Sequence, residues 1–305
     1  MGKLNSHLAG AVFALAAAAM NGSIGVISKV LLSMGISPSS IAFVKTIIGG
    51  ALLSILLIFV RNSAPRIPWH QAAICAFFGI FTLFFFETAA YQHESAANVV
   101  FTLMAFAAFS ALILSWVVLG DKPQFAQWFG FMIAIVGVGL IVGVRFEVNI
   151  KGIVLAAIAG SGYGLFSVLV KKFKLEGGLV LTRQLLFFGS MFLLLPAAHN
   201  GFEPELQDYK AVAALVALAI LPTILGFFCT TKAIDLLPPS QVQILELSEP
   251  LFAAGLAFLL INERPGIEAF YGGALIITGL IVANEVLTFG SANSKPMEKV
   301  SSISK

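Results

Sequence analysis

Two stretches of this chain decide its fold: residues 121–137 read DKPQFAQWFGFMIAIVG, and residues 263–279 read ERPGIEAFYGGALIITG. Each begins with an acidic residue, a basic residue and a proline, and each continues as an apolar run with matching glycines. Gly130 corresponds to Gly272 and Gly137 to Gly279, at a constant separation of 142 residues. Single glycines match easily by chance, but an ordered triplet with two correctly spaced glycines does not, so the chain contains an internal repeat.

The same displacement relates positions outside these stretches. For example, Lys29 in the first copy corresponds to Lys171 in the second. We therefore expect one copy of the repeat over residues 8–145 and a second over residues 150–288, followed by a cytoplasmic tail over residues 291–305.

The amino-acid composition indicates that this protein is embedded in a lipid membrane. Hydrophobic residues make up 59% of the 305 positions, and charged residues only 11%. Soluble domains carry about 25% charged residues, so an ordinary soluble enzyme and a disordered chain are excluded. The net charge of +3 is too small for nucleic-acid binding, and the basic residues are too scattered along the chain to form a phosphate-binding surface. Cys75 and Cys229 both lie in apolar runs, which argues against a disulfide framework.

Ten apolar runs are long enough to cross a bilayer, which takes about 20 helical residues. They are continuously apolar rather than alternating, so they predict an all-α membrane protein and not a β-barrel. The predicted spans are residues 8–28, 39–60, 69–91, 95–117, 124–144, 150–170, 178–198, 210–232, 240–261 and 266–288.

The number of spans in each copy determines how the copies are oriented. After five crossings the chain lies on the opposite side of the membrane from its start. The second copy therefore begins on that opposite side and must be inverted relative to the first. Inverted five-helix repeats give many secondary transporters two nearly equivalent conformations that open to opposite sides of the membrane.

The distribution of Lys and Arg predicts that both termini are cytoplasmic, because cytoplasmic loops carry the excess of these residues. In that orientation the cytoplasmic side of the membrane receives Lys3, Arg61, Arg66, Lys122, Lys171, Lys172, Lys174, Lys232, Lys295, Lys299 and Lys305. The outer side receives Arg145, Lys151, Lys210 and Arg264.

Two carboxylates in the ninth span are the strongest candidates for function. A charge at the centre of a membrane helix costs about 2.5–3.5 kcal/mol on insertion scales. Glu246 and Glu249 lie three residues apart on one helical face, and Pro250 favours a kinked, polar stretch there. Their repulsion would favour protonation of one of them, which suggests a role in proton coupling or substrate binding. The alternatives are that one carboxylate is neutralised by a basic partner or is permanently protonated.

Other intramembrane charges suggest two gates. Lys29, Lys45 and Glu87 are predicted near the outer face, and Glu246 and Arg183 near the inner face. Each group is a candidate ion-pair cluster that closes one side of the protein. For Lys29, simple extension of the side chain to the interface is equally open.

The chain resembles the drug/metabolite transporter superfamily, and within it the EamA-type carriers. The similarity covers about residues 8–288. It is carried by residues 247–254, Glu263, Arg264, Gly272 and Gly279 in the second copy, and by Lys29, Asp121, Pro123, Gly130 and Gly137 in the first. The chain departs from the family pattern at Asn21, Lys45 and Ala108.

The resemblance implies secondary transport of small metabolites, often export of amino acids or related compounds, without selecting a substrate. We expect Glu249 as the midplane anion, Glu246 as its partner and Lys29 as a counter-charge for a carboxylate. Asn21 and Tyr163, which are 142 residues apart, are the expected lining residues. A passive channel is the alternative. No nucleophile, metal or nucleotide motif is recognisable, so we expect no enzyme, no metal and no cofactor.

Overall fold

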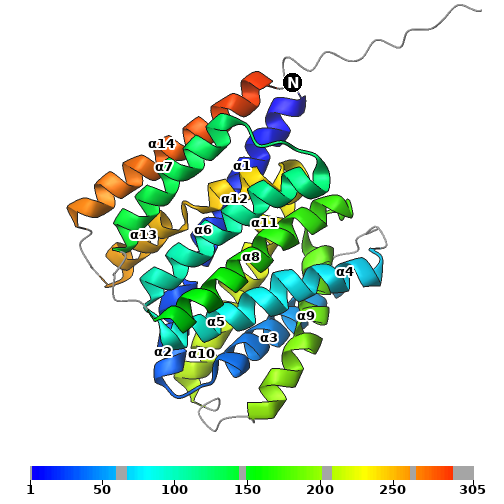
Figure 1. The fold of residues 1–305 in the computed structure, drawn as a ribbon. Coiled ribbons are helices and arrows are strands. Elements are labelled where there is room, and N and C mark those ends of the chain that lie inside the picture. Colours follow the sequence, from blue (N-terminus) through cyan, green and yellow to red (C-terminus); the bar gives the residue numbers. More distant parts are fainter. Residues whose placement is uncertain (1, 60–66, 144–148, 201–207, 262–265, 291–305) are drawn as a thin grey trace, which may run out of the picture.

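The computed structural model describes residues 2–59, 67–143, 149–200, 208–261 and 266–290, and every element within these ranges is a helix (Figure 1). The elements are α1 Gly2–Asn21, α2 Ile24–Ser33, α3 Pro38–Phe59, α4 Trp69–Ala76, η1 Phe77–Thr82, α5 Leu83–His93, α6 Ala96–Leu114, η2 Ser115–Leu119, α7 Phe125–Val142, α8 Ile150–Lys172, α9 Leu179–Asn200, α10 Tyr209–Leu218, η4 Ala219–Gly226, α11 Phe227–Leu236, α12 Pro239–Glu246, α13 Glu249–Ile261 and α14 Ile267–Gly290.

Eight helical segments of the described chain are long and apolar enough to cross a membrane. Their bounds agree with the first eight predicted spans to within four residues, except that the first segment continues to Ser33, five residues beyond its predicted end. In the region of the tenth predicted span, the apolar helix Phe270–Ala283 is shorter than a full crossing. Two sequence features, the triplet at 263–265 and the tail at 291–305, lie outside the described residues.

The first and ninth predicted spans are interrupted. Gly22 and Ser23 separate α1 from α2, and Leu247 and Ser248 separate α12 from α13. At the first break the Ser23 hydroxyl donates to the carbonyl of Met20 at 3.0 Å, a local bond that competes with helical pairing. At the second break Pro250 has no amide hydrogen with which to continue the helical hydrogen bonds. Broken membrane helices leave main-chain polar groups at the level of the break.

The repeat is visible in the backbone as two matching π-helical segments. η1 interrupts the third span and η4 interrupts the eighth. They begin at Phe77 and Ala219, which are 142 residues apart, the same displacement that relates the glycines of the sequence motif. Pro222 lies inside η4, where it removes one backbone donor. The two copies therefore share a local distortion as well as a sequence pattern.

α7 and α14 lie side by side along their lengths (Figure 1). A Cβ added at Gly130 would lie 2.5 Å from the carbonyl oxygen of Gly279, and one added at Gly137 would lie 2.5 Å from that of Gly272. Because the glycine earlier in one helix meets the glycine later in the other, the helices are antiparallel. The backbones approach this closely because glycine has no side chain.

α8 runs through the middle of the bundle between α6 and α5 (Figure 1). Gly160 packs against Leu103, and Gly164 against Ala107, so α6 and α8 are parallel. α8 begins beside Glu94, which contacts Gly152. It ends near Lys171, roughly 28 Å further along at about 1.5 Å per residue. We name the two ends of the bundle the Glu94 end and the Lys171 end.

Candidate functional site

A small closed cavity lies at the centre of the bundle. Its volume is about 20 Å³, enough for one water molecule. The lining side chains come from the first, third, fourth, sixth, eighth and ninth predicted spans, which are three pairs of corresponding spans. They include the predicted residues Asn21, Glu87, Tyr163 and Glu249. The structure thus brings together four residues that are separated by up to 228 positions in the chain.

A larger groove of about 540 Å³ opens at the Glu94 end. Its walls are formed by α2, the start of α6, the end of α7 and the first turns of α13. Most of the lining is apolar, with Val26, Val100 and Ile141 among its residues. Glu249 lines both the groove and the closed cavity, so this carboxylate stands at the junction between them.

Glu249 is the first residue of α13, directly after the break in the ninth span. Its side chain is 6% exposed, and no hydrogen bond to its carboxylate is found within the described part of the chain. The charged groups close enough to act on it electrostatically are two other carboxylates, Glu87 and Glu246. A buried carboxylate without a basic or hydrogen-bonding partner is unfavourable unless a proton or another cation neutralises it.

Glu246, by contrast, is held in a hydrogen-bond network. Its carboxylate accepts from the Thr230 hydroxyl at 2.8 Å and from the Gln243 amide at 3.3 Å. The Tyr163 hydroxyl lies 3.1 Å from that of Thr230, and the Gln243 amide also donates to Ser167 at 3.0 Å. Glu246 is fully buried, and so is every residue of α12. This network separates the cavity from the Lys171 end.

Glu87 and Lys45 lie together on the other side of the cavity. Glu87 accepts a hydrogen bond from the Tyr91 hydroxyl at 3.3 Å. Lys45 is 0% exposed, its ammonium has no hydrogen-bond partner, and it lies 3.9 Å from the centre of the Phe84 ring. Lys45 and Glu87 interact electrostatically without forming an ion pair in this conformation. The aromatic face offers Lys45 only part of the stabilisation that a carboxylate would give.

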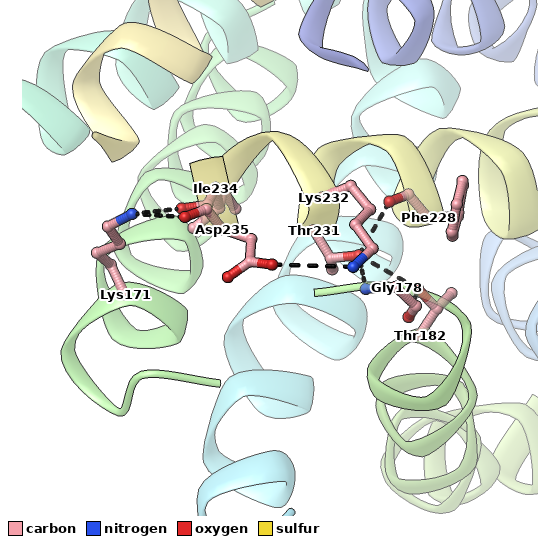
Figure 2. A network of polar contacts seen from close by, with 8 residues as sticks. All are labelled: Lys171, Gly178, Thr182, Phe228, Thr231, Lys232, Ile234 and Asp235. Atoms are coloured by element: carbon pink, nitrogen blue, oxygen red, sulfur yellow. Dashed lines mark hydrogen bonds and ion pairs between the residues drawn. The ribbon is translucent and has the colours of Figure 1, made fainter. Parts of the chain in front are cut away.

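Lys29 and Lys171 occupy equivalent positions at opposite ends of the bundle. The Lys29 ammonium donates to the carbonyl of Glu94, the residue that caps α5, at 2.6 Å. The Lys171 ammonium donates to the carbonyls of Ile234 and Asp235, in the last turn of α11, at 2.8 and 3.0 Å (Figure 2). Both lysines therefore bind the C-terminal end of a helix, where unpaired carbonyls and the helix dipole favour a cation.

The Lys171 end contains further contacts between the sixth, seventh and eighth spans (Figure 2). The Thr231 hydroxyl accepts from the amide of Gly178 at 3.2 Å. Lys232 and Asp235 form an ion pair at 3.8 Å that is partly exposed and therefore contributes little to stability. These contacts hold the start of α9 against the end of α11.

At the opposite end, the Glu94 carboxylate joins three segments. It accepts from the Ser95 amide at 2.7 Å, from the Asn98 side chain at 3.1 Å and from the Asn149 amide at 2.6 Å. Burial by itself raises the pKa of Glu94, but these hydrogen bonds outweigh burial and hold the pKa below its ordinary value of 4.5. The carboxylate thereby connects the turn between α5 and α6 to the start of α8.

The predicted clusters of charged residues are only partly assembled in this conformation. Lys45 and Glu87 lie close together, but the Lys29 ammonium is hydrogen-bonded to the main chain instead. Glu246 is bonded to Thr230 and Gln243, which satisfy its carboxylate, and the half-buried Arg183 forms no ion pair with it. A role for these ion pairs in the opposite conformation stays a prediction.

Several residues of the site were not predicted from the sequence. Thr230, Gln243 and Tyr91 carry the hydrogen bonds of Glu246 and Glu87, and Phe84 receives the Lys45 ammonium. Gln243 could have been found, because it lies three residues before Glu246 on the same helix. Thr230 could not, since it comes from another span. Within the described ranges, no group of three or more His, Cys, Asp or Glu side chains is placed to hold a metal ion.

The chain belongs to the EamA-like transporter family, whose model matches it twice, over residues 8–143 and 150–284. An uncharacterized transporter of Archaeoglobus fulgidus is 26% identical over 254 residues, which cover 80% of this chain and 87% of the relative. A probable terminal-alkyne amino-acid exporter of Streptantibioticus cattleyicolor is 30% identical over 189 residues, covering 60% of this chain and 62% of the relative.

A solved crystal structure has the same fold. Its TM-score to this chain is 0.74 at 20% sequence identity, over 93% of this chain and 99% of the other. The family match and the apolar helices identify the protein as a multi-pass membrane protein of a transporter family.

Proposed function

We propose that the protein is a secondary active transporter, and that it exports a small polar metabolite such as an amino acid or a related compound by alternating access. The observation that carries this proposal is the position of Glu249. It lies at a helix break, between a groove open at one end and a closed cavity, while the other end is sealed by the buried network around Glu246. A binding residue reachable from one side only is what alternating access requires.

The proposed architecture has ten spans arranged as two inverted five-helix repeats. The antiparallel contact of α7 with α14 supports the inversion, because the two helices occupy equivalent places in the two copies. The matching π-helical segments η1 and η4 support the repeat itself. The ninth and tenth spans would be α12 with α13, and α14. The mechanism then exchanges the conformations of the two copies, which moves the opening from the Glu94 end to the Lys171 end.

We propose the inner membrane as the location, with both termini in the cytoplasm. The excess of Lys and Arg on the side of Lys171 supports this orientation. The Lys171 end then faces the cytoplasm, the Glu94 end faces outward, and the groove of this conformation opens to the outside. Export would require a second conformation in which the network of Glu246, Thr230 and Tyr163 opens.

Protons are the proposed coupling ion. Within the described part of the chain, Glu249 has carboxylates and no basic group as its charged neighbours. A proton and a substrate would then compete for the same carboxylate, which is a direct way to couple two fluxes. Asn21 and Tyr163, which line the closed cavity from equivalent positions, are the proposed neutral contacts to the substrate. The name of the Streptantibioticus relative favours amino-acid-like compounds.

Counterflow in proteoliposomes tests the proposal. Vesicles loaded with an unlabelled amino acid should transiently accumulate the labelled form from outside, with saturation, and a screen over amino acids and their derivatives should find at least one substrate. Glu249→Gln should abolish the pH dependence of that exchange. Glu176→Gln, which removes one exposed carboxylate elsewhere, should leave the exchange unchanged. Persistence of the pH dependence in Glu249→Gln would remove Glu249 from coupling.

A passive channel is the alternative function, and the same vesicles separate the two. A channel equilibrates solute without counterflow and without saturation. The buried α12 and its hydrogen bonds to neighbouring spans favour the carrier, since they block the Lys171 end in this conformation.

A further inference from the structure

We propose that the groove at the Glu94 end binds organic ammonium compounds, with the cation at Glu249 and an apolar body along the groove wall. This inference rests on the proposed transport function and narrows it to a substrate class. It predicts that a positive amino group is the essential feature of a ligand and that a free carboxylate is not required.

Acidic side chains outnumber basic ones around Glu249. Three buried carboxylates, those of Glu249, Glu87 and Glu246, lie near one another at the centre of the protein. The one buried ammonium close to them in the described ranges is that of Lys45, which interacts with Glu87. The described centre of the protein therefore contains more acidic than basic side chains. An entering cation can replace the proton that neutralises a buried carboxyl group, whereas an entering anion would find no free basic group there to neutralise it.

Glu249 also has an unused hydrogen-bonding capacity. Its carboxylate is more than nine-tenths buried, lines the groove, and has no hydrogen-bond partner within the described residues. An ammonium group supplies up to three donors and a full positive charge in a compact shape. It therefore satisfies the carboxylate at the place where the structure leaves it unpaired.

The wall of the groove is apolar and acidic. Val26, Val100, Leu140 and Ile141 line the groove, and Glu268 at its exposed margin adds a second acidic side chain. Its described lining contains no Lys or Arg. A volume of about 540 Å³ falls within the usual range for sites that take small organic ligands. The groove thus suits a molecule with one charged end and one apolar end.

The basic side chains nearest to the groove are already engaged in other contacts. The Lys29 ammonium donates to the Glu94 carbonyl at 2.6 Å and lines neither the groove nor the closed cavity. The Lys45 ammonium lies against Phe84. A ligand carboxylate would therefore meet apolar side chains and acidic groups in this groove, and would lose its hydration without compensation.

The test compares three probes of matched shape: 2-phenylethylamine, 3-phenylpropionate and 2-phenylethanol. Binding to the purified protein in lipid nanodiscs is measured by calorimetry at pH 7.5. We expect saturable binding of the amine, and binding of the alcohol and the carboxylate weaker by about tenfold or more. Glu249→Gln should weaken amine binding by a similar factor, Glu249→Asp should retain the preference for the amine, and Glu176→Gln should bind as the wild type does.

Two outcomes overturn the inference. One is equal or tighter binding of the carboxylate, and the other is amine binding that Glu249→Gln leaves unaltered in a protein that remains monodisperse. Counterflow in proteoliposomes separates these outcomes from failure of the proposed function. A protein that exchanges amino acids but does not bind the amine is a carrier of another specificity. A protein that shows no counterflow with any compound is not the proposed carrier, whatever it binds.

Discussion

Gly130 packs against the carbonyl of Gly279, and the equivalent residue of the other copy, Gly272, packs against that of Gly137. The contact is thus reciprocal, as an approximate twofold axis between α7 and α14 requires. The four glycines are the ones that reveal the repeat in the sequence. Their spacing is explained by the close approach of two backbones that have no room for a side chain.

The glycine contact should be sensitive to a single methyl group. Gly130→Ala or Gly137→Ala would place a Cβ 2.5 Å from a carbonyl oxygen, so the helices must separate. We expect a loss of about 1–3 kcal/mol in the free energy of unfolding, measured in detergent. Gly255→Ala is the matched control, because an added Cβ there meets nothing within 4 Å. Equal stability of the three variants would contradict this packing.

The helix-capping lysines should stabilise the fold at both ends. Lys171→Met removes the donor to the carbonyls of Ile234 and Asp235, and Lys29→Met removes the donor to Glu94. Each loss should cost about 1–3 kcal/mol of stability in detergent, since these are hydrogen bonds from a charged group. Lys172→Met deletes the same charge from an exposed neighbour and should have little effect. A similar loss in Lys172→Met would indicate that only the charge matters.

The Glu94 carboxylate should give a pH-dependent contribution to stability. Its pKa in the folded protein lies below 4.5, so its contribution is complete above that pH and disappears as the pH falls through the folded pKa. Wild type should therefore be more stable than Glu94→Gln at pH 7, and the difference should shrink below about pH 4. Thermal unfolding in an acid-tolerant detergent measures it. A difference that does not vary with pH would exclude this role of the carboxylate.

Lys45 and Glu87 should be energetically coupled although they form no direct ion pair here. Removing either charge alone leaves the other buried with less compensation, so Lys45→Met and Glu87→Gln should each destabilise the protein. The double variant should recover part of the loss, with a coupling energy of about 0.5–3 kcal/mol. A double-mutant cycle by denaturant unfolding in mixed micelles measures this energy, and strict additivity would show that the two groups act independently.

Accessibility to reagents should differ between the two ends of the bundle. In a variant with Cys75 and Cys229 replaced by Ala, a cysteine at Ala97 lines the groove and should react with a membrane-impermeant thiol reagent added outside intact cells. A cysteine at Gln243, buried in the network of Glu246, should react far more slowly. The reverse pattern would place the groove on the cytoplasmic side.

The overall fold was largely accessible from the sequence because lipid imposes strict rules on it. Continuous apolar runs indicate eight of the observed spans with limits that agree to within five residues, and the glycines that share the constant spacing pack against one another in α7 and α14. The break at Gly22 was not predicted. The sequence there stays apolar on both sides, and the break packs closely against another helix: a Cβ at Gly22 would lie 3.0 Å from the amide nitrogen of Ala253.

The candidate site was harder to predict, because charged residues were matched only with other charged residues. Asn21, Tyr163 and Glu249 line the closed cavity, and their depth within a span can be counted along a helix. The acceptors of Lys29 and Lys171 are main-chain carbonyls, which a comparison of side chains alone does not reveal. Likewise, the carboxylate of Glu246 is satisfied by a hydroxyl and an amide rather than by Arg183.

The shared role of Lys29 and Lys171 carries a cost for membrane insertion. If the copies are mutually inverted, these two equivalent lysines must be delivered to opposite compartments. The charge of Lys171 then assists the insertion of the second copy, and that of Lys29 opposes the insertion of the first. The remaining loops must outweigh Lys29 when the nascent chain chooses its direction, so a chain stripped of their basic residues should insert in both senses.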